Sequence, residues 1–92
     1  MEREEILQRV SDVIRQVLMA EQLVVKPESN LADDLGMDSM GAVEFVNTVE
    51  DEYKISINED EMQSIKTVND AVNLIWKKTN GHEAGLGMGD AS

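Results

Sequence analysis

The sequence contains no cysteine, and aromatic residues, proline and histidine are scarce in it. Without cysteine there is no disulfide, no thiolate metal ligand and no cysteine nucleophile, so any thiol chemistry needs a borrowed group. The single histidine, His82, lies in a glycine-rich stretch near the C-terminus. A serine–histidine–aspartate triad or a two-histidine metal site therefore cannot be assembled. We expect a protein that is not an enzyme and has no metal site.

Long hydrophobic runs are also missing from the 92 residues. The first residues, MEREE, do not resemble an apolar signal segment, and no stretch is long enough to span a bilayer. We therefore expect a cytoplasmic protein that does not insert into membranes. A chain of this length forms one small domain with a modest core, which we expect to act as a monomer.

Positive charge is scarce as well, and the formal net charge is −11. Residues 28–70 carry twelve acidic side chains against two lysines, so this segment alone has a net charge of −10. Such a field repels nucleic acid and anionic membrane surfaces. It attracts a partner protein with a basic patch.

Hydrophobic periodicity predicts helices throughout the chain. Apolar residues from Ile6 to Val17 recur at helical spacing, and we expect this helix to end near Ala20. Residues 21–37 lack a sustained period and contain proline and glycine, which predicts a long loop. We expect four apolar side chains to hold that loop on the core: Leu23, Val25, Leu31 and Leu35.

A second helix is expected to begin at Asp38 or Ser39, with Asp38 as its N-cap. Its predicted core face consists of Ala42, Phe45, Val46, Val49 and Tyr53. A short connection, 55–58, leads to a brief helix over 59–63, for which Asn58 is the expected cap.

The last helix is expected to start from a Thr67 cap with Asp70 at its third position. Its predicted inward face is Val68, Ala71, Val72, Ile75 and Trp76, and two lysines follow at its C-terminal end. Residues 80–92 are glycine-rich and are expected to form a flexible tail outside a domain of residues 1–79. The fold class is thus all-α: a bundle of three main helices and one short helix, with a long first loop.

The second helix breaks a local rule at its C-terminal end. Glu50, Asp51 and Glu52 crowd a helix terminus whose dipole disfavours anions. Glu44 and Asp51 are seven residues apart and therefore lie on nearly the same face, with Asn47 between them. Because violations of local rules tend to mark functional surfaces, we interpret this stripe as a docking surface for a partner.

The residues around Ser39 resemble a known family. Residues 30–40 read NLADDLGMDSM and are followed by Val43-Glu44, as in the signature of acyl carrier proteins. The later segment EDEYKISI and the pair Thr67-Val68 also match that family, and the resemblance spans roughly residues 4–78. It implies an acyl-carrier-like four-helix bundle.

The resemblance also implies the chemistry. It makes Ser39 the serine that receives 4′-phosphopantetheine from coenzyme A, and Asp38 the adjacent acid that the phosphopantetheinyl transferase reads. Acyl groups would be held as thioesters on this arm and delivered to acyl-transferring and synthase enzymes with basic docking patches. The residues expected to meet these partners are Met40, Val43, Glu44, Asn47, Glu50 and Asp51. A helix N-terminus also favours the phosphodiester of such an arm.

Three positions depart from the family pattern. Met40 replaces the usual leucine, Gly41 stands where an acidic or polar residue is common, and Asn47 replaces a commonly apolar residue. These departures suggest a specialised carrier, for example in cell-envelope lipid or secondary-metabolite synthesis. A carrier in ordinary fatty acid synthesis is the other expectation. A polyketide or an aminoacyl or peptidyl carrier remains an alternative. An acidic helical adaptor without a prosthetic group is an alternative of another class.

Overall fold

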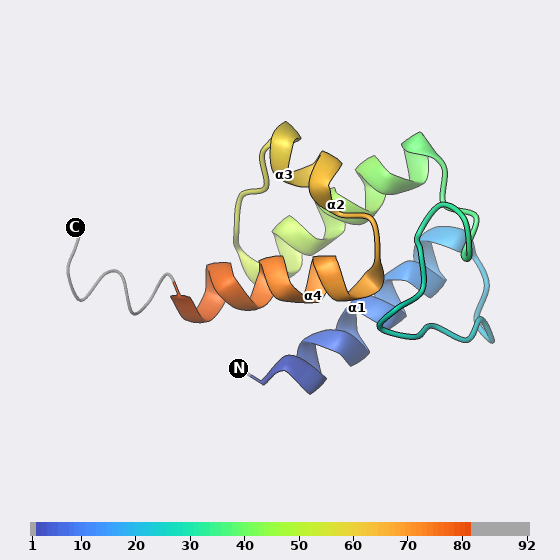
Figure 1. Cartoon of the computed structure of the whole chain (residues 1–92), viewed down its shortest axis with the longest axis horizontal. Coiled ribbons are helices and arrows are strands. Elements are labelled where there is room, and N and C mark those ends of the chain that lie inside the picture. Colours follow the sequence, from blue (N-terminus) through green and yellow to red (C-terminus); the bar gives the residue numbers. More distant parts are fainter. Residues whose placement is uncertain (1, 82–92) are drawn as a thin grey trace.

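The computed structural model describes residues 2–81 and is built from helices joined by a long first loop (Figure 1). The α-helices are α1 (Arg3–Leu18), α2 (Ser39–Tyr53), α3 (Glu59–Ser64) and α4 (Val68–Trp76). A π-helical segment, η1 (Lys77–Gly81), follows α4 directly. Within the described residues, strand-like pairing is limited to one isolated bridge between Asn30 and Thr67. The predicted all-α class, with three main helices and one short one, is confirmed.

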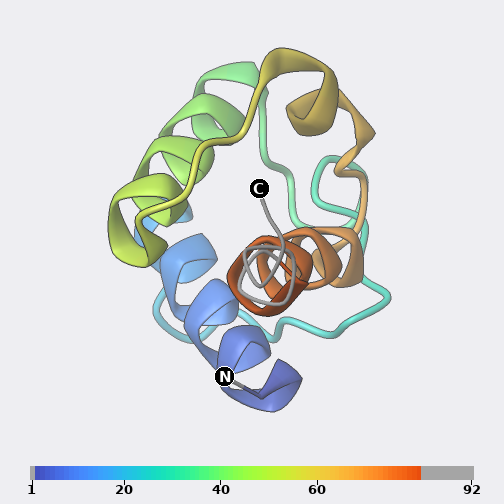
Figure 2. The same ribbon diagram turned by 90° about the vertical axis from the view of Figure 1, so that its left-hand side faces the viewer.

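Helix α1 is the central element and contacts both α2 and α4. Figure 2 views α4 almost end-on, with α1 crossing beside it and α2 on the left. The buried hydrophobic residues come from all three of these helices and from the first loop: Ile6, Val10, Val13, Ile14, Leu31, Met37, Phe45, Val46, Val49, Val68, Ala71, Val72 and Ile75. The structure thus confirms the predicted core faces of α1 and α2.

Two details of the predicted helices differ from the structure. Helix α1 ends at Leu18, two residues before Ala20, because Met19 adopts a left-handed conformation with φ 54°. Trp76 was expected to face the core and instead is 38% exposed, with the Arg3 guanidinium 5.1 Å from its ring centroid. The core position at this end of α4 is filled by Ile75. The indole therefore lies at the surface, where it interacts with a cation.

The first loop is tied to the start of α4 by backbone hydrogen bonds. The Leu31 N–H donates to the Lys66 carbonyl at 2.9 Å, and the Val68 N–H donates to the Ser29 carbonyl at 3.0 Å. The four apolar side chains expected to hold the loop are buried or packed against the core, as predicted. The loop therefore has a fixed path, although it contains no regular element.

Side-chain caps define where the shorter helices begin. Asn58 caps α3 and Thr67 caps α4, in both cases as predicted and each within a reciprocal capping box with the residue three positions on. Helix α3 has only six residues and none of them is buried. A helix of this length is unstable alone, so its position depends on its caps and on neighbouring contacts.

The helical backbone continues past α4, two residues into the expected tail, because η1 reaches Gly81. Within η1 the Lys78 ammonium lies 3.1 Å from a Glu61 carboxylate oxygen, which links the C-terminal segment to α3. Residues 82–92, including His82, lie outside the described part of the chain.

Candidate functional site

Ser39 is the first residue of α2 and is exposed to solvent. Its hydroxyl has no hydrogen-bond partner among the described residues, and neither do the backbone N–H groups of Ser39 and Met40. The first amides of a helix have no intrahelical acceptor, and the positive end of the helix dipole lies there. The site therefore offers a free hydroxyl next to two free amide donors, an arrangement that suits a phosphodiester.

Asp38 is the N-cap of α2, as predicted, and its position determines that of Ser39. The Asp38 carboxylate accepts the backbone N–H of Gly41 at 2.8 Å, and its carbonyl accepts the N–H of Ala42 at 2.9 Å. One carboxylate oxygen thus satisfies an orphan donor of the first turn. The remainder of the exposed carboxylate is accessible at the surface next to Ser39.

Gly41 allows this cap to fit closely. A Cβ atom at Gly41 would lie 3.2 Å from a carboxylate oxygen of Asp38 and 3.2 Å from Cγ of Met37. It would also lie 3.6 Å from a methyl group of Val17 on α1. A side chain at this position would therefore require the Asp38 and Met37 side chains to shift by a few tenths of an ångström.

Beside Ser39, α2 presents a mixed apolar and acidic face to solvent. Met40 is 81% exposed and Val43 is 47% exposed. Glu44, Asn47 and Asp51 are also exposed, and none of their side chains has a polar partner among the described residues. The structure thus places five of the six expected docking residues on one accessible face.

Glu50 differs from the other five expected docking residues. Its side chain is only partly exposed, and its carboxylate accepts the backbone N–H of Ile57 at 2.7 Å. This bond fixes the connection between α2 and α3. The Glu50 carboxylate, which was expected to meet a partner, therefore has a structural role within the fold.

Glu52 likewise has an intramolecular partner. Both of its oxygens accept from the Arg9 guanidinium on α1, at 2.9 and 3.0 Å. These hydrogen bonds lower the pKa of the Glu52 carboxyl below its ordinary value. Two of the three acids that crowd the end of α2 are thus accounted for by internal contacts. The free negative charge of the stripe comes from Glu44 and Asp51.

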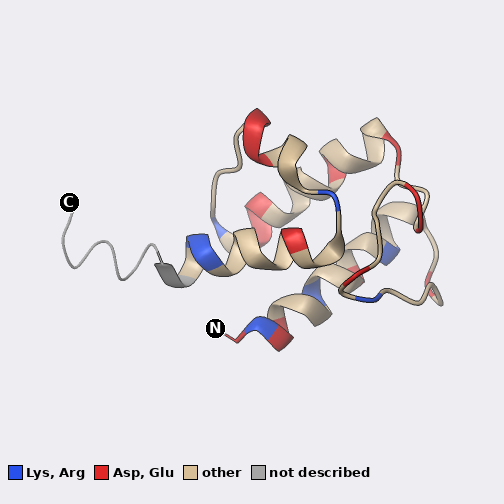
Figure 3. Ribbon diagram, viewed as in Figure 1, with Lys and Arg blue, Asp and Glu red and all other residues tan. Residues whose placement is uncertain are grey.

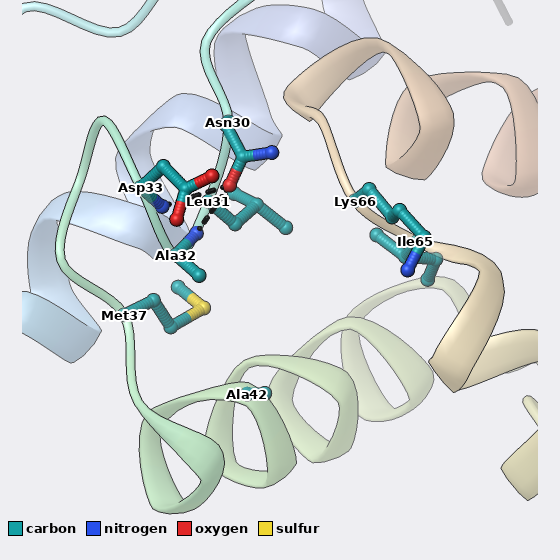
Figure 4. A pocket seen from close by; sticks show the side chains of 8 residues that line it. All are labelled: Asn30, Leu31, Ala32, Asp33, Met37, Ala42, Ile65 and Lys66. Atoms are coloured by element: carbon teal, nitrogen blue, oxygen red, sulfur yellow. Dashed lines mark hydrogen bonds between the residues drawn. The ribbon is translucent and has the colours of Figure 1, made fainter.

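A cavity of about 340 Å³ adjoins the first turn of α2 (Figure 4). Its lining comes from three separate segments: Asn30, Leu31, Ala32, Asp33 and Met37 from the loop, Ala42 from α2, and Ile65 and Lys66 from the link between α3 and α4. Sequence reasoning missed this cavity. The lining residues are distant in the chain and have no shared motif, so only the packing of loop against link brings them together.

No group of three or more histidine, cysteine, aspartate or glutamate side chains within residues 2–81 is arranged to hold a metal ion. None of the helices in this part of the chain has the length and apolar character needed to cross a membrane. Acidic residues lie on the loop, on α2 and on α3 (Figure 3).

Residues 8–75 match the family model described as a phosphopantetheine attachment site. The chain is also 41% identical over 78 residues to an acyl carrier protein of Prochlorococcus marinus, covering 85% of this chain and 98% of the relative. The chain belongs to the acyl carrier protein family. Its prosthetic group is therefore 4′-phosphopantetheine, on which members of this family carry acyl groups as thioesters.

Solved structures agree with this assignment. The acyl carrier protein of Enterococcus faecalis is 39% identical, with a TM-score of 0.65 over 82% of this chain and 95% of its own. The holo acyl carrier protein of Geobacter metallireducens is 26% identical, with a TM-score of 0.71 over 92% of this chain and 94% of its own. The expected acyl carrier fold is thereby confirmed. Family membership also rules out the alternative of an adaptor without a prosthetic group.

Proposed function

We propose that Ser39 is the attachment point of the 4′-phosphopantetheine arm of this carrier. The supporting observation is a free, exposed serine hydroxyl at the N-terminus of a 15-residue helix, beside two free amide donors. The family match spans this position. The residues present fit the group: the amides of Ser39 and Met40 would receive the phosphodiester, and the arm supplies the thiol that the chain lacks.

Intact-mass measurement after incubation with coenzyme A and a phosphopantetheinyl transferase tests the attachment. We expect one arm per chain, and fragmentation should place it on Ser39. The Ser39→Ala variant should remain unmodified, whereas Ser29→Ala, a matched change of another serine, should be modified like the parent protein. Modification of the Ser39→Ala variant, or no modification of the parent protein, would contradict the proposal.

In this proposal the chain itself performs no chemical step. It binds the arm, presents the loaded thioester and docks on partner enzymes, including the phosphopantetheinyl transferase and the acyl-transferring and synthase enzymes. The transferase would approach Asp38 and Ser39 together. That the carrier acts as a cytoplasmic monomer stays a prediction, and light scattering of the holo protein tests the oligomeric state.

We further propose that partners dock on the exposed face of α2. Met40 and Val43 would contact apolar surface near the attachment site, while Glu44 and Asp51 would pair with basic side chains of the partner. Asn47 would contribute a neutral polar contact between them. Glu50 would support this face indirectly, by fixing the connection that follows α2.

Charge variants separate these roles. Glu44→Gln and Asp51→Asn should each slow association with a basic partner and reduce its salt dependence, because each removes a free surface charge. Glu50→Gln keeps an acceptor for the Ile57 N–H and should change association much less. Stopped-flow rates with the transferase, measured at several salt concentrations, provide the test. Equal effects of all three variants would contradict the distinction between the docking charges, Glu44 and Asp51, and the structural Glu50.

The pathway in which this carrier works depends on which enzymes accept it. We propose a carrier in fatty acid or specialised lipid synthesis, and the departures at Gly41 and Asn47 favour a specialised role. The named relatives are acyl carrier proteins, which favours acyl over aminoacyl or peptidyl cargo. Offering the holo protein to a general malonyl transferase and ketosynthase tests this: efficient elongation would contradict the specialised role.

A further inference from the structure

The end of α1 carries an apolar side chain that does not contribute to the core. Met19 is the C-cap of this helix and is 90% exposed, more than any other large hydrophobic residue in the described part of the chain. Its side chain therefore adds nothing to the packing of the domain. A single exposed apolar side chain is common on a protein surface, however, and does not by itself indicate a binding site.

The backbone at Met19 is also in an unfavourable conformation. Its φ of 54° and ψ of 45° are left-handed, a region that glycine adopts freely and other residues adopt at a cost. This conformation serves the helix end, because the N–H groups of Met19 and Ala20 donate to carbonyls of the last turn at 3.2 and 2.9 Å. Glycine is the usual residue at such a helix end and would keep both bonds. The fold alone thus favours glycine here, and a local rule broken in this way tends to mark a functional surface.

Met19 borders a groove on the outer face of α1. Two adjoining hollows, of about 560 and 370 Å³, lie along this helix, and Asp12 and Arg15 line both of them. They therefore form one groove, which we call the α1 groove. Met19 lines one end of it, and the partly buried Leu7 and Val25 line the other. The twelve residues from Leu7 to Met19 correspond to about 18 Å of helix, at about 1.5 Å per residue.

The middle of the α1 groove is held in place by internal contacts. The Arg15 Nε donates to the Leu23 carbonyl at 2.8 Å, and an Arg15 terminal nitrogen donates to Asp12 Oδ1 at 3.0 Å. The first bond joins α1 to the loop, and the second pairs the two charges that line both hollows. The guanidinium is thus oriented before a partner arrives, which lowers the cost of binding.

The charge that remains uncompensated in the α1 groove is negative. Arg15 is paired with Asp12, whereas the exposed Glu21, which lines the groove beside Met19, has no ion-pair partner within residues 2–81. The chain as a whole has a formal net charge of −11. A second copy of this chain would bring the same charge and be repelled, while a basic partner would be attracted.

The α1 groove is separate from the exposed face of α2. Figure 2 shows α2 along the upper left of the molecule and the first part of the loop, which borders the groove, along its lower side. The groove nevertheless ends near the start of α2, because a Cβ atom on Gly41 would lie 3.6 Å from a methyl group of Val17, two residues before Met19. A protein in this groove is therefore close to the Ser39 end of the molecule and leaves the face of α2 free.

We propose that the α1 groove binds an amphipathic basic helix of a partner protein. Met19 is its main apolar contact, and Glu21 pairs with a lysine or arginine of the partner. A helix that lays its apolar face into a groove is a common mode of recognition, and about 18 Å accommodates about three turns. Burying Met19 removes exposed apolar surface from water, which favours binding. The inference concerns a second docking surface and does not depend on the attachment to Ser39.

The test titrates the isotope-labelled holo protein with a synthetic probe, a hydrocarbon-stapled peptide of about twelve residues with leucines on one face and lysines on the other. A stapled peptide of the same composition in scrambled order is the control for unspecific attraction to an acidic protein. The helical probe should bind saturably and shift the backbone amide signals of Leu7, Met19 and Val25, and the scrambled peptide should not. Shifts confined to α2, or equal shifts with both peptides, would overturn the proposal.

Glycine variants assign the effect to the Met19 side chain. Met19→Gly should weaken binding of the probe by about tenfold, since the buried area of one large apolar side chain is lost. Its thermal midpoint should be unchanged or raised, because glycine prefers the same backbone conformation. Lys54→Gly is the matched control: Lys54 caps α2 with φ 57°, is exposed and lies outside the groove, so the probe should bind this variant like the parent protein.

A lowered midpoint of Met19→Gly would show that the methionine serves the fold, and unchanged binding by this variant would show that it does not meet the probe; either result overturns the proposal. Glu21→Gln should reduce the salt dependence of binding more than Glu28→Gln does, since Glu28 is exposed but lies outside the groove. Equal salt dependence of the two variants would contradict the role of Glu21. Sedimentation velocity tests the other occupant: dimers of the parent protein that Met19→Gly abolishes would assign the groove to a second copy instead.

Discussion

At the scale of single residues, Asp38 combines two roles that a sequence motif does not separate. Its carboxylate caps α2 through the Gly41 N–H, and it lies beside the proposed attachment serine. The cap needs an acceptor oxygen, and recognition by a transferase needs an accessible charge. Substitutions can remove one property and keep the other, because asparagine is as good an N-cap as aspartate.

Asp38→Ala should therefore destabilise the domain by about 0.5–2 kcal/mol through loss of the cap, whereas Asp38→Asn should cost much less. Both variants should be modified more slowly by the transferase, since both lack the charge. Urea unfolding and kcat/KM for arm transfer measure the two effects. Normal transfer to Asp38→Asn would show that the carboxylate acts on stability alone.

Gly36 has a backbone role just before the site. Its φ is +75°, a left-handed conformation, and it precedes the buried Met37. No heavy atom lies within 4 Å of a Cβ built on it, so only backbone strain opposes a side chain there. Gly36→Ala should lower the free energy of unfolding by about 1–2 kcal/mol, and Gly36→Asn by less, because asparagine tolerates this region. Thermal or chemical denaturation of the two variants checks the order.

At the scale of elements, α3 is the helix most dependent on its neighbours. None of its residues is buried, and its contacts with the core come from the partly buried Met62 and from Ile65 just beyond its end. Its ion pair with η1 joins Lys78 to Glu61, which also accepts the Asn58 N–H in the capping box. The C-terminal segment is thus coupled to the helix that precedes the cavity-lining link.

Removing this ion pair should loosen α3 without unfolding the domain. Lys78→Gln should speed hydrogen exchange of the α3 amides at low salt, and high salt should narrow the difference because it screens the pair. Lys77→Gln removes an exposed neighbouring charge that acts on Glu61 more weakly than Lys78 does, and it should change this exchange less. Equal exchange in the two variants would mean that the Lys78–Glu61 contact does not hold α3.

At the scale of the whole molecule, acidic residues dominate the electrostatics, yet several of them serve the fold. The pKa of Asp70 is lowered from its ordinary value of 3.8, chiefly because its carboxylate accepts the Lys66 N–H. The pKa of Glu61 is lowered from 4.5, first by the Asn58 N–H and then by Lys78. Carboxylates with a lowered folded-state pKa contribute stability that is fully present above the unfolded-state pKa.

That contribution is lost as the pH falls through the lowered folded-state values. We therefore expect the stability of the parent protein to fall below about pH 5. Asp70→Asn should be less stable at neutral pH and should lose less on acidification, because the amide does not titrate. Asp51→Asn, whose side chain has no partner in the described residues, should follow the parent curve. Thermal midpoints from pH 7 to pH 3 test the difference.

Local signals in the sequence were sufficient for the elements and for the position of Ser39 at the start of a helix. The caps at Asp38, Asn58 and Thr67 depend on side chains within three residues, so short-range pattern predicted them correctly. The core faces of α1 and α2 follow from helical periodicity. Ser39 was placed at a helix start by the same local logic, and the surrounding motif indicated the family.

Features that depend on contacts between distant segments were decided only by the tertiary structure. Trp76 fits the periodic pattern of α4 but lies beneath Arg3 at the surface, since Ile75 already fills the core. Glu50 and Glu52 belong to one acidic run, yet Ile57 binds the first and Arg9 the second. The cavity joins loop, helix and link. Periodicity and capping act over three or four residues, whereas these features arise only when distant segments pack together.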